Sequence, residues 1–453
     1  MQSPEYTHKS SIQKDGSRPK IRLADVKGFF TRFKNVTFPL IIVIFFVIPL
    51  LKFGGERFLL LQVDQRVFNI AGFVFNAQDV YLIFFIVTGL AFSLFFITAL
   101  FGRVWCGYLC PQTVILEGVY RKIERWIEGP KNQQLILEKS AWNKEKIMKK
   151  GLKYFLYALV SLLFAFGFIS YFVPHSYYIE LWQHGPSTHP TVFLWGLILS
   201  FIFYGNFAWF REQLCLIICP YGRLQSALTD DDTFVIGYDE KRGEPRGKLK
   251  DENRGACIDC ARCVVVCPTG IDIRQGMQME CIGCANCIDA CDEIMEKTNQ
   301  LKGLIRYDSY NGFNGEKTKL LRPRIYVYMV LLLIGFLVFS VFLRNRQNFE
   351  ANLLRLSGRP YTFDAGQIRN AFEIHLINKS AQEQRYTISV ESEQKQLESI
   401  MPFKSITLKK NEDKRIPLFL ILNKDMYKED FEVSVKIHVD EIEKQIPIKF
   451  LGP

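Results

Sequence analysis

Histidine is scarce in this sequence, and its distribution excludes one class of membrane redox protein. Only six of the 453 residues are histidines, and none lies in any of the five long apolar runs. A haem inside a membrane needs histidine ligands on facing helices, so we expect no membrane b haem. Rossmann and Walker glycine loops are also missing, which argues against a nucleotide site. Three histidines share one short loop, where an external metal site is the alternative to a surface position: His175, His184 and His189.

Cysteine is missing from most of the chain. All twelve cysteines lie at 106, 110, 215, 219 and within 257–291, and residues 344–453 have none. Structural disulfides belong to oxidising compartments, whereas cysteines confined to a few short motifs are typical of metal or redox sites in a reducing compartment. We therefore expect thiols that bind metal or carry electrons.

Charged residues are absent from five apolar runs: 36–51, 80–101, 154–173, 191–210 and 325–343. About 20 helical residues span the hydrocarbon core of a bilayer, so the last four runs are long enough. The first is shorter and contains Pro39 and Pro49. Because charged segments flank it on both sides, we expect it to span as well.

Basic residues outnumber acidic ones by 57 to 46, and the excess flanks the apolar runs. Residues 1–35, 102–153 and 211–324 are rich in Lys and Arg, whereas 52–79 and 174–190 are poor in them. Since cytoplasmic loops carry the positive charge, this pattern predicts a bacterial inner-membrane protein with 344–453 outside, and no nucleic-acid partner. The polar N-terminal stretch, 1–30, is expected to be mobile.

The cysteines of 257–291 form two ferredoxin runs. CIDCARCVVVCP at 257–268 and CIGCANCIDAC at 281–291 share the spacing C-x2-C-x2-C-x3-C, typical of bacterial proteins with two 4Fe–4S clusters. In such proteins the fourth cysteine of each run binds the other cluster. We therefore assign Cys257, Cys260, Cys263 and Cys291 to cluster 1, and Cys281, Cys284, Cys287 and Cys267 to cluster 2.

Zinc is the alternative ligand, but structural zinc sites pair two separated C-x2-C knuckles and fit these runs poorly. Asp292 stands where a second proline would follow the run, so the second half is expected to fold differently from the first. Met277 and Met279, between the runs, are expected to fill a small core, with soft copper ligation as the alternative.

The other four cysteines form a repeated motif after the second and fourth apolar runs. FGRVWCGYLCPQ and FREQLCLIICPY both read F-x4-C-x3-C-P, with Cys106 and Cys110 in one and Cys215 and Cys219 in the other. If each helix continues through its pair, both sulfurs lie on one face and the proline ends the turn. Two thiolates suit Cu(I), and four together suit one ion or a further cluster. Small buried side chains are the alternative.

Residues 344–453 have a different pattern. Alternating runs such as FEIHLIN at 372–378 and FEVSVKIHV at 431–439 predict an immunoglobulin-like antiparallel β-sandwich that serves for docking. The expected fold is mixed: a cytoplasmic N-terminal segment 1–35, a four-helix membrane domain 36–220, a cytoplasmic ferredoxin-like domain 221–324 with two 4Fe–4S clusters, a fifth transmembrane helix 325–343 and a periplasmic sandwich 344–453.

These motifs together resemble a known family. WCGYLCPQTV at 105–114, the second C-x3-C-P at 215–220, the ferredoxin runs and DACDEIMEKTNQLKGLIRY at 289–307 resemble the cytochrome c oxidase accessory proteins CcoG and FixG. The resemblance covers nearly the whole chain. It implies an iron–sulfur oxidoreductase in the assembly of a cbb-type oxidase, which reduces Cu(II) to Cu(I) for copper insertion. The expected partners are membrane lipid, the oxidase with its copper-delivery proteins and a cytoplasmic electron donor, while homo-oligomerisation is left open.

Two other functions stay open at the level of sequence. A polyferredoxin subunit that delivers electrons to a quinone-linked or respiratory complex would share the C-x3-C-P motifs and the ferredoxin runs, although the outer sandwich favours the accessory family. A scaffold whose clusters only stabilise the fold would leave four thiols at the membrane edge unused. Cluster-dependent reduction of Cu(II) separates these hypotheses.

Overall fold

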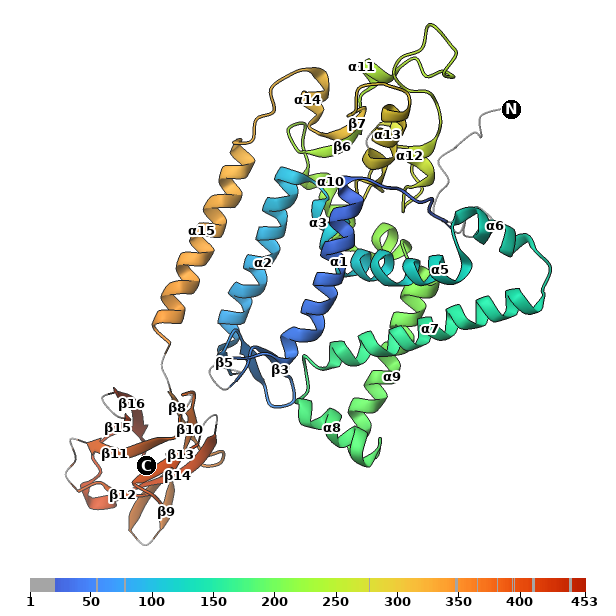
Figure 1. The fold of residues 1–453 in the computed structure, drawn as a ribbon. Helices are drawn as coiled ribbons and strands as arrows, with labels where there is room; N and C mark the ends of the chain where they lie inside the picture. Colours follow the sequence, from blue (N-terminus) through green and yellow to red (C-terminus); the bar gives the residue numbers. More distant parts are fainter. Residues whose placement is uncertain are drawn as a thin grey trace. The chain divides into compact units, whose positions relative to one another are not determined.

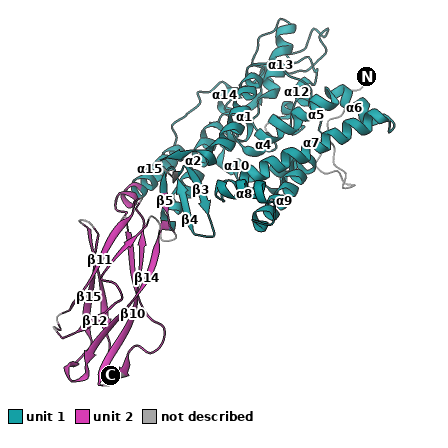
Figure 2. Cartoon of the chain, turned by 60° about the horizontal axis from the view of Figure 1, so that its bottom comes forward, with its two compact units in different colours: residues 1–73, 80–339 teal, residues 74–79, 340–453 magenta. Residues whose placement is uncertain are grey.

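The computed structural model describes residues 21–53, 56–76, 79–276, 278–346, 349–364, 366–380, 382–392, 394, 396–409, 412–439 and 442–453. The chain divides into two compact units (Figure 2). Unit 1 comprises residues 1–73 and 80–339, and unit 2 comprises residues 74–79 and 340–453. Among the described residues, five helices are long and apolar enough to cross a membrane.

The five expected spans all form helices (Figure 1). Their bounds are α1 Phe29–Val47 with the 3-10 turn η1 Ile48–Leu50, α2 Val80–Phe101, α7 Lys144–Ile169, α9 Pro190–Tyr204 with the π-helical turn η4 Gly205–Phe210, and α15 Pro323–Arg344. Two of these helices begin well before their apolar runs, because the charged and polar residues that precede the runs also continue the helix. Phe29 opens α1 and Lys144 opens α7.

Short elements connect the spans within unit 1. Before α2 lie β1 Lys52–Phe53, β2 Glu56–Arg57, β3 Leu59–Gln62, β4 Val67–Ile70 and β5 Phe73–Phe75. After α2 lie α3 Val104–Tyr108, α4 Pro111–Ile115, the π-helical turn η3 Leu116–Tyr120, α5 Arg121–Glu128 and α6 Lys131–Lys139; α8 is His175–His184. After α9 lie the π-helical turn η5 Leu214–Ile218, α10 Pro220–Leu228, β6 Val235–Tyr238, α11 Glu240–Gly243, α12 Arg262–Val265, the 3-10 turn η6 Ile273–Gln275, α13 Asn286–Lys297, β7 Ile305–Asp308 and α14 Tyr310–Asn314.

The span ends that the charge pattern assigns to the cytoplasm lie together in unit 1. Arg322, just before α15, donates to a carbonyl near the end of α2 at 2.5 Å. Arg211, at the end of α9, pairs with Glu124 of α5 at 2.8 Å. Glu128 of the same helix pairs with Lys153, in the N-terminal half of α7, at 2.7 Å. The start of α15 therefore lies near the end of α2, and α5 contacts both the end of α9 and the first half of α7.

The ferredoxin segment has two unequal halves. β6 and β7 pair as antiparallel strands beside it. The helix of the first run, α12, stops at Val265, before Cys267 and Pro268, whereas α13 continues through Cys291 to Lys297. Proline disfavours a helical residue before it, and Asp292 imposes no such restriction. The expected difference between the halves is therefore present.

The start of the described chain contacts the ferredoxin segment. The first twenty residues lie outside the described part, but Ala24 donates its N–H to the carbonyl of Val265 at 3.1 Å. The Asp289 carboxylate accepts the backbone N–H of Thr31 at 2.7 Å, in the first turn of α1. A carboxylate at a helix N-terminus satisfies free N–H groups and suits the helix dipole. These contacts show that the described part of 1–30 is attached to the ferredoxin segment, while residues 1–20 lie outside the described part and their mobility stays a prediction.

Unit 2 contains the antiparallel sandwich that its alternating sequence predicts. The order of strands is β12-β14-β10-β8 in one sheet, with β9 on β10, and β13-β11-β15-β16 in the other. The strands are β8 Phe349–Arg355, β9 Thr362–Asp364, β10 Gln367–Asn378, β11 Gln384–Ser392, β12 Glu398–Ile400, β13 Ser405–Leu408, β14 Asp413–Asn423, β15 Phe431–Val439 and β16 Ile442–Phe450, with the 3-10 turn η7 Lys424–Met426. Alternate residues of β10 and β14 enter the core, as in Ile374 and Leu418, which are fully buried or nearly so.

A short segment that precedes α2 also belongs to unit 2. Asp79, which is buried, pairs with Arg346 at 2.8 Å and with Lys379 at 3.1 Å. Lys379 also pairs with Glu350 at 2.5 Å. Buried charges of this kind are tolerated only when paired, so Asp79 explains why 74–79 groups with the sandwich.

Candidate metal centres

Four cysteines from both ferredoxin runs line one small cavity, which we call cavity 1. They are Cys257, Cys260, Cys263 and Cys291. The first three come from the loop before and within α12, and the fourth comes from the middle of α13. These are the residues that the sequence assigns to cluster 1, so the chain brings the expected set together.

A second small cavity, cavity 2, shares Cys263 with the first. It is lined by Cys267, Cys281, Cys284 and Cys287, and also by Cys263 of the first run. Isoleucines supply most of the remaining lining, so the site excludes water on those sides. The two runs therefore exchange their fourth cysteines in space, as the ferredoxin spacing predicts.

The backbone of both runs turns in the same unusual way. Asp259 and Ala261 in the first run, and Gly283 and Ala285 in the second, have φ of 53°, 52°, 68° and 59°. Left-handed φ costs a non-glycine residue roughly 1–2 kcal/mol, so its repetition at equivalent positions points to a requirement. Alternating right- and left-handed residues direct successive N–H groups into one concavity, an arrangement that recurs at iron–sulfur sites. The residues present therefore fit a cubane in each cavity.

Electrostatics also favours a cationic occupant. Burial, followed by the neighbouring thiolates, raises the pKa of Cys287 well above its usual value and that of Cys281 to about 12. For Cys284 the pKa rises to about 11, again because of burial first. The raised pKa values mean that thiolates are unfavourable here without a positive charge beside them. The irons of a cluster would supply that charge.

Single metal ions fit this part of the chain poorly. A tetrahedral zinc site, with Zn–S near 2.3 Å, needs sulfurs about 3.8 Å apart. No three His, Cys, Asp or Glu side chains approach closely enough for one ion among the residues described. The geometry therefore gives no support to the zinc alternative, whereas a cubane separates its thiolates more widely.

The histidine loop can also be compared with the geometry that a metal ion needs. His175 and His184 lie at the two ends of α8, and His189 follows it. His189 pairs with Glu180 at 2.7 Å and stacks on Tyr177, with ring centroids 4.0 Å apart. The described residues form no three-ligand site here, which favours the surface position over the external metal site.

The C-x3-C-P motifs do not continue the membrane helices, so the condition for placing both sulfurs of a pair on one helix face is not met. The helix of α2 ends at Phe101, and η4 ends at Phe210. The next residues, Gly102 and Arg211, have φ of 57° and 55°, which no helix continues through. A residue with positive φ is a common end for a helix.

Proline begins a new helix in both motifs and does not end one. Cys106 lies in α3 and Cys215 in η5, while Cys110 and Cys219 are extended residues that precede α4 and α10. The prolines after them are the first residues of those helices. Proline suits this position because its missing N–H would have no partner in the first turn.

The two motifs nevertheless meet. Burial raises the pKa of Cys106 to about 11, and the thiolates of Cys110 and Cys219 raise it further. Burial raises that of Cys215 to about 12, followed by the influence of the other three thiolates. Gln225 of α10 donates to the Cys106 sulfur at 3.2 Å. These four cysteines, the thiol quartet, therefore lie near one another in one partly buried region, although here too no three ligands of the described part of the chain are close enough to hold a single ion.

The thiol quartet lies against the second ferredoxin run. Gly107 packs so closely that a Cβ there would stand 2.6 Å from the carbonyl oxygen of Gly283. Arg103 donates to the carbonyls of Cys281 at 3.1 Å and Gly222 at 2.6 Å. One guanidinium therefore links both C-x3-C-P motifs to the cysteines of cavity 2.

A small cavity of about 150 Å³ adjoins both sites. Arg103, Gln225 and Cys281 contribute to its lining, together with Met279. The Met279 side chain is 66% exposed, so it does not fill a core as expected. Met277, the other candidate copper ligand between the runs, lies outside the described residues.

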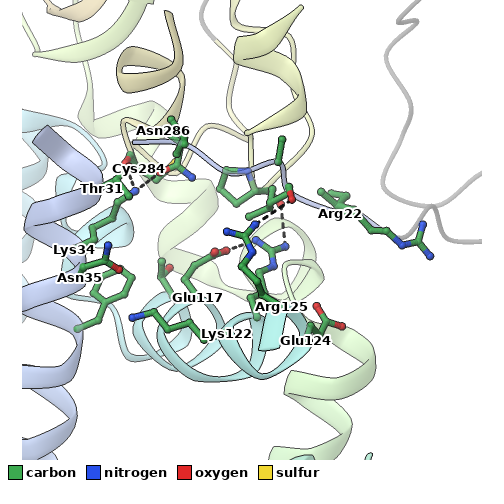
Figure 3. A pocket seen from close by; sticks show the side chains of 18 of the residues that line it. Arg22, Thr31, Lys34, Asn35, Glu117, Lys122, Glu124, Arg125, Cys284 and Asn286 are labelled. Carbon is green, nitrogen blue, oxygen red and sulfur yellow. Dashed lines mark hydrogen bonds and ion pairs between the residues drawn. The ribbon is translucent and has the colours of Figure 1, made fainter. Parts of the chain in front are cut away.

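A basic cavity of about 160 Å³ lies on the other side of the second run (Figure 3). Lys34 of α1 is buried and donates to the Cys284 carbonyl at 2.8 Å, and it also contacts Asn286. Arg121 donates to the Pro268 carbonyl at 3.4 Å. Positive charge therefore stands next to the backbone of cavity 2.

Sequence reasoning missed several of these contacts. Lys34 and Gln225 have no spacing relation to any cysteine, and Tyr307 lies beyond the ferredoxin runs. Tyr307 donates to the Gly283 carbonyl at 2.6 Å. Such contacts join residues far apart in the chain, so no local pattern could have revealed them.

Three family models match the chain. One described as a 4Fe–4S binding domain matches residues 82–130, and a 4Fe–4S dicluster domain matches 210–310. The immunoglobulin-like fold at the C-terminus of FixG matches 339–453. The first match includes Cys106 and Cys110 of the thiol quartet.

Curated relatives cover most of the sequence. Protein RdxA of Cereibacter sphaeroides is 37% identical over 72% of this chain and 73% of its own length. RdxB of the same organism is 35% identical over 79% and 82%. Nitrogen fixation protein FixG of Rhizobium meliloti is 29% identical over 83% and 79%. With five apolar helices, two iron–sulfur domain matches and a FixG-type sandwich, the chain belongs to the FixG/CcoG family and is an iron–sulfur electron-transfer protein of membranes.

Proposed function

We propose that this protein is a cupric reductase of cbb-type cytochrome c oxidase assembly, in which the thiol quartet receives copper. The observation that carries the proposal is the contact between the quartet and the second ferredoxin run. Gly107 packs on Gly283, and Arg103 joins both C-x3-C-P motifs to the Cys281 carbonyl. Copper bound at the quartet would therefore lie next to cavity 2.

The clusters would be held by the two sets of cysteines that line cavities 1 and 2. When bound, 4Fe–4S clusters supply one-electron chemistry at potentials set by hydrogen bonds, charge and solvent exposure. The chain supplies the apolar walls, which keep water from the site, and the positive charge of Lys34, which favours a more negative, reduced cluster.

Copper is the substrate in this proposal. Cu(II) takes up one electron and becomes Cu(I), which thiolates bind in preference to Cu(II). Because burial raises the pKa of Cys106 and Cys215, the thiols lose protons when copper binds. The site therefore favours the reduced ion by ligand softness.

The proposed setting is the bacterial inner membrane. The ferredoxin domain would face the cytoplasm, where a reductant donates electrons, and the sandwich would face the periplasm. There the sandwich would dock the oxidase or its copper-delivery proteins. The clustering of the basic span ends on the ferredoxin side supports this orientation.

The direct test uses full-length protein purified without oxygen and reduced with dithionite. Cu(I) formation is followed with a Cu(I)-specific chelator, and iron is measured on the same sample. We expect the variant with Ser at all four quartet positions to reduce Cu(II) at least about tenfold more slowly while keeping about eight irons. A normal rate with full iron content would contradict the proposal.

Iron content also separates this proposal from a third cluster at the quartet. About twelve irons per wild-type chain, falling to about eight in the quadruple Ser variant, would assign the quartet to iron. A polyferredoxin subunit without a copper role would retain no copper after desalting.

The assignment of cysteines to the two clusters is tested with single Ser variants. Cys267→Ser should damage the cavity 2 cluster, and Cys291→Ser should damage the cavity 1 cluster.

A further inference from the structure

An apolar cavity of about 550 Å³ lies beside the first two spans and takes no part in the function proposed above. Ligand sites for small molecules are typically 300–1,000 Å³ and mainly apolar, with a few polar groups. Its walls come from α1, the end of α2, α3 and β7, and include Phe29, Phe33, Phe101, Leu109, Tyr108 and Tyr307.

The walls nearest the spans are open. Phe29 and Phe33, in the first two turns of α1, are 73% and 49% exposed, and Phe101, at the end of α2, is 47% exposed. Both helices are membrane spans, so these side chains lie where the hydrocarbon of a bilayer ends. A molecule dissolved in the membrane can therefore reach the cavity, whereas a hydrated reductant meets only aromatic surface.

The deep wall carries a polar group whose hydrogen bonding is incomplete. Tyr108 is only 7% exposed, and its hydroxyl has no hydrogen bond of ordinary geometry to any residue described. The Tyr307 hydroxyl is close enough for a weak interaction with that of Tyr108, but its own proton goes to the Gly283 carbonyl at 2.6 Å, so the Tyr108 hydroxyl is left without a well-formed hydrogen bond. Leaving a buried hydroxyl without a partner costs about 1–3 kcal/mol, so a ligand with an acceptor oxygen fits this position.

We propose that this cavity binds the ring of a lipid-soluble quinone or quinol, with the Tyr108 hydroxyl bonded to a ring oxygen. A planar ring fits between phenylalanine and tyrosine faces, and its tail can leave through the open wall. A phospholipid acyl chain also suits the apolar walls, but it has no atom for Tyr108.

The location gives such a ligand a use. Tyr307 contacts the carbonyl of Gly283, which lies between Cys281 and Cys284 of cavity 2. Tyr108 follows Cys106 in the same short helix, α3. A redox role for the ligand rests on the proposed electron-transfer function, whereas binding does not, and binding is what the experiment measures.

The test measures equilibrium binding of a short-tailed, radiolabelled benzoquinone to the full chain in detergent. Tyr108→Phe removes only the hydroxyl and should weaken binding roughly tenfold, the effect of one buried hydrogen bond. Tyr310→Phe is the matched control, because Tyr310 is 52% exposed in α14 and does not line the cavity. Thr37→Trp should abolish binding, because a large side chain then enters the cavity from α1.

The outcomes separate quinone from lipid. Binding that Thr37→Trp removes but Tyr108→Phe leaves unchanged would identify an apolar slot for acyl chains and overturn the proposal, as would no binding to wild type. Iron content shows whether each variant is folded. Copper reduction by dithionite-treated protein is measured separately, so a failure of the copper proposal and a failure of quinone binding are distinguishable.

Discussion

Gly107 is the residue on which the contact between the quartet and cavity 2 most directly depends. A Cβ there would lie 2.6 Å from the Gly283 oxygen and 3.0 Å from the Cys284 Cα, both of which are backbone atoms. We expect Gly107→Ala to push α3 away, destabilise the protein by about 1–3 kcal/mol and slow Cu(II) reduction. Melting temperature and reduction rate measure both effects.

Gly335→Ala is the matched control, since nothing lies within 4 Å of a Cβ at that position in α15. It should leave both quantities unchanged. If Gly107→Ala reduced Cu(II) as fast as the control, close approach of α3 to the second run would not matter for function.

Lys34 is the charged residue nearest the backbone of cavity 2, and it is 8% exposed. Its ammonium donates to the Cys284 carbonyl, and its positive charge stabilises the more negative, reduced cluster. We expect Lys34→Met to lower the midpoint potential of the cavity 2 cluster and leave that of cavity 1 unchanged, whereas Lys34→Arg should retain most of the effect. A redox titration followed by electron paramagnetic resonance measures both, and equal shifts in Met and Arg variants would exclude the charge as the cause.

At the scale of elements, a buried ion pair joins α5 to the end of α9. Arg211 is 3% exposed and Glu124 is 7% exposed, with 2.8 Å between Nη2 and Oε2. Removing one partner of such a pair leaves a buried charge uncompensated, so Arg211→Met should cost about 3–5 kcal/mol. Replacing both residues by Met should recover part of this loss.

The surface pair between Lys149 and Glu145 of α7 provides the comparison. Exposed i,i+4 pairs contribute at most about 0.5 kcal/mol, so Lys149→Met should barely change the melting temperature. A loss in Arg211→Met no larger than in Lys149→Met would show that the link between α5 and α9 carries no stability.

For the whole molecule, orientation in the membrane is open to direct measurement. We expect a reporter fused near residue 240 to be active only in the cytoplasm, and one fused after 345 only in the periplasm. The α15 helix between them contains no charged residue from 325 to 343 and is long enough to span. Both reporters active on the same side would mean that α15 does not cross the membrane.

The sandwich should fold without unit 1. Its core alternates along β10, β14, β11 and β15, and it contains no cysteine. We expect residues 340–453, expressed alone, to be soluble, rich in β-structure and free of iron. Circular dichroism and iron analysis test this, and a helical spectrum would contradict it.

Lys379 loses its ion-pair partner Asp79 in this fragment. A longer fragment that retains residues 74–79 through a linker should therefore have a higher melting temperature.

Sequence alone determined the features that depend on neighbours in the chain. The apolar runs predicted all five helices, alternation predicted the sandwich, and ferredoxin spacing predicted which cysteines would meet in each cavity. Asp292 predicted the unequal halves. These features follow from local rules: helix length, strand period, and the reach of closely spaced thiols.

Tertiary structure decided how the motifs meet and what surrounds them. The helices stop before the C-x3-C-P pairs because Gly102 and Arg211 adopt positive φ, which residue types alone do not dictate. Long-range packing brings the thiol quartet together, sets Gly107 against Gly283 and places Lys34 beside Cys284. These contacts join residues many positions apart, and their geometry depends on the packing of the whole unit rather than on any local pattern.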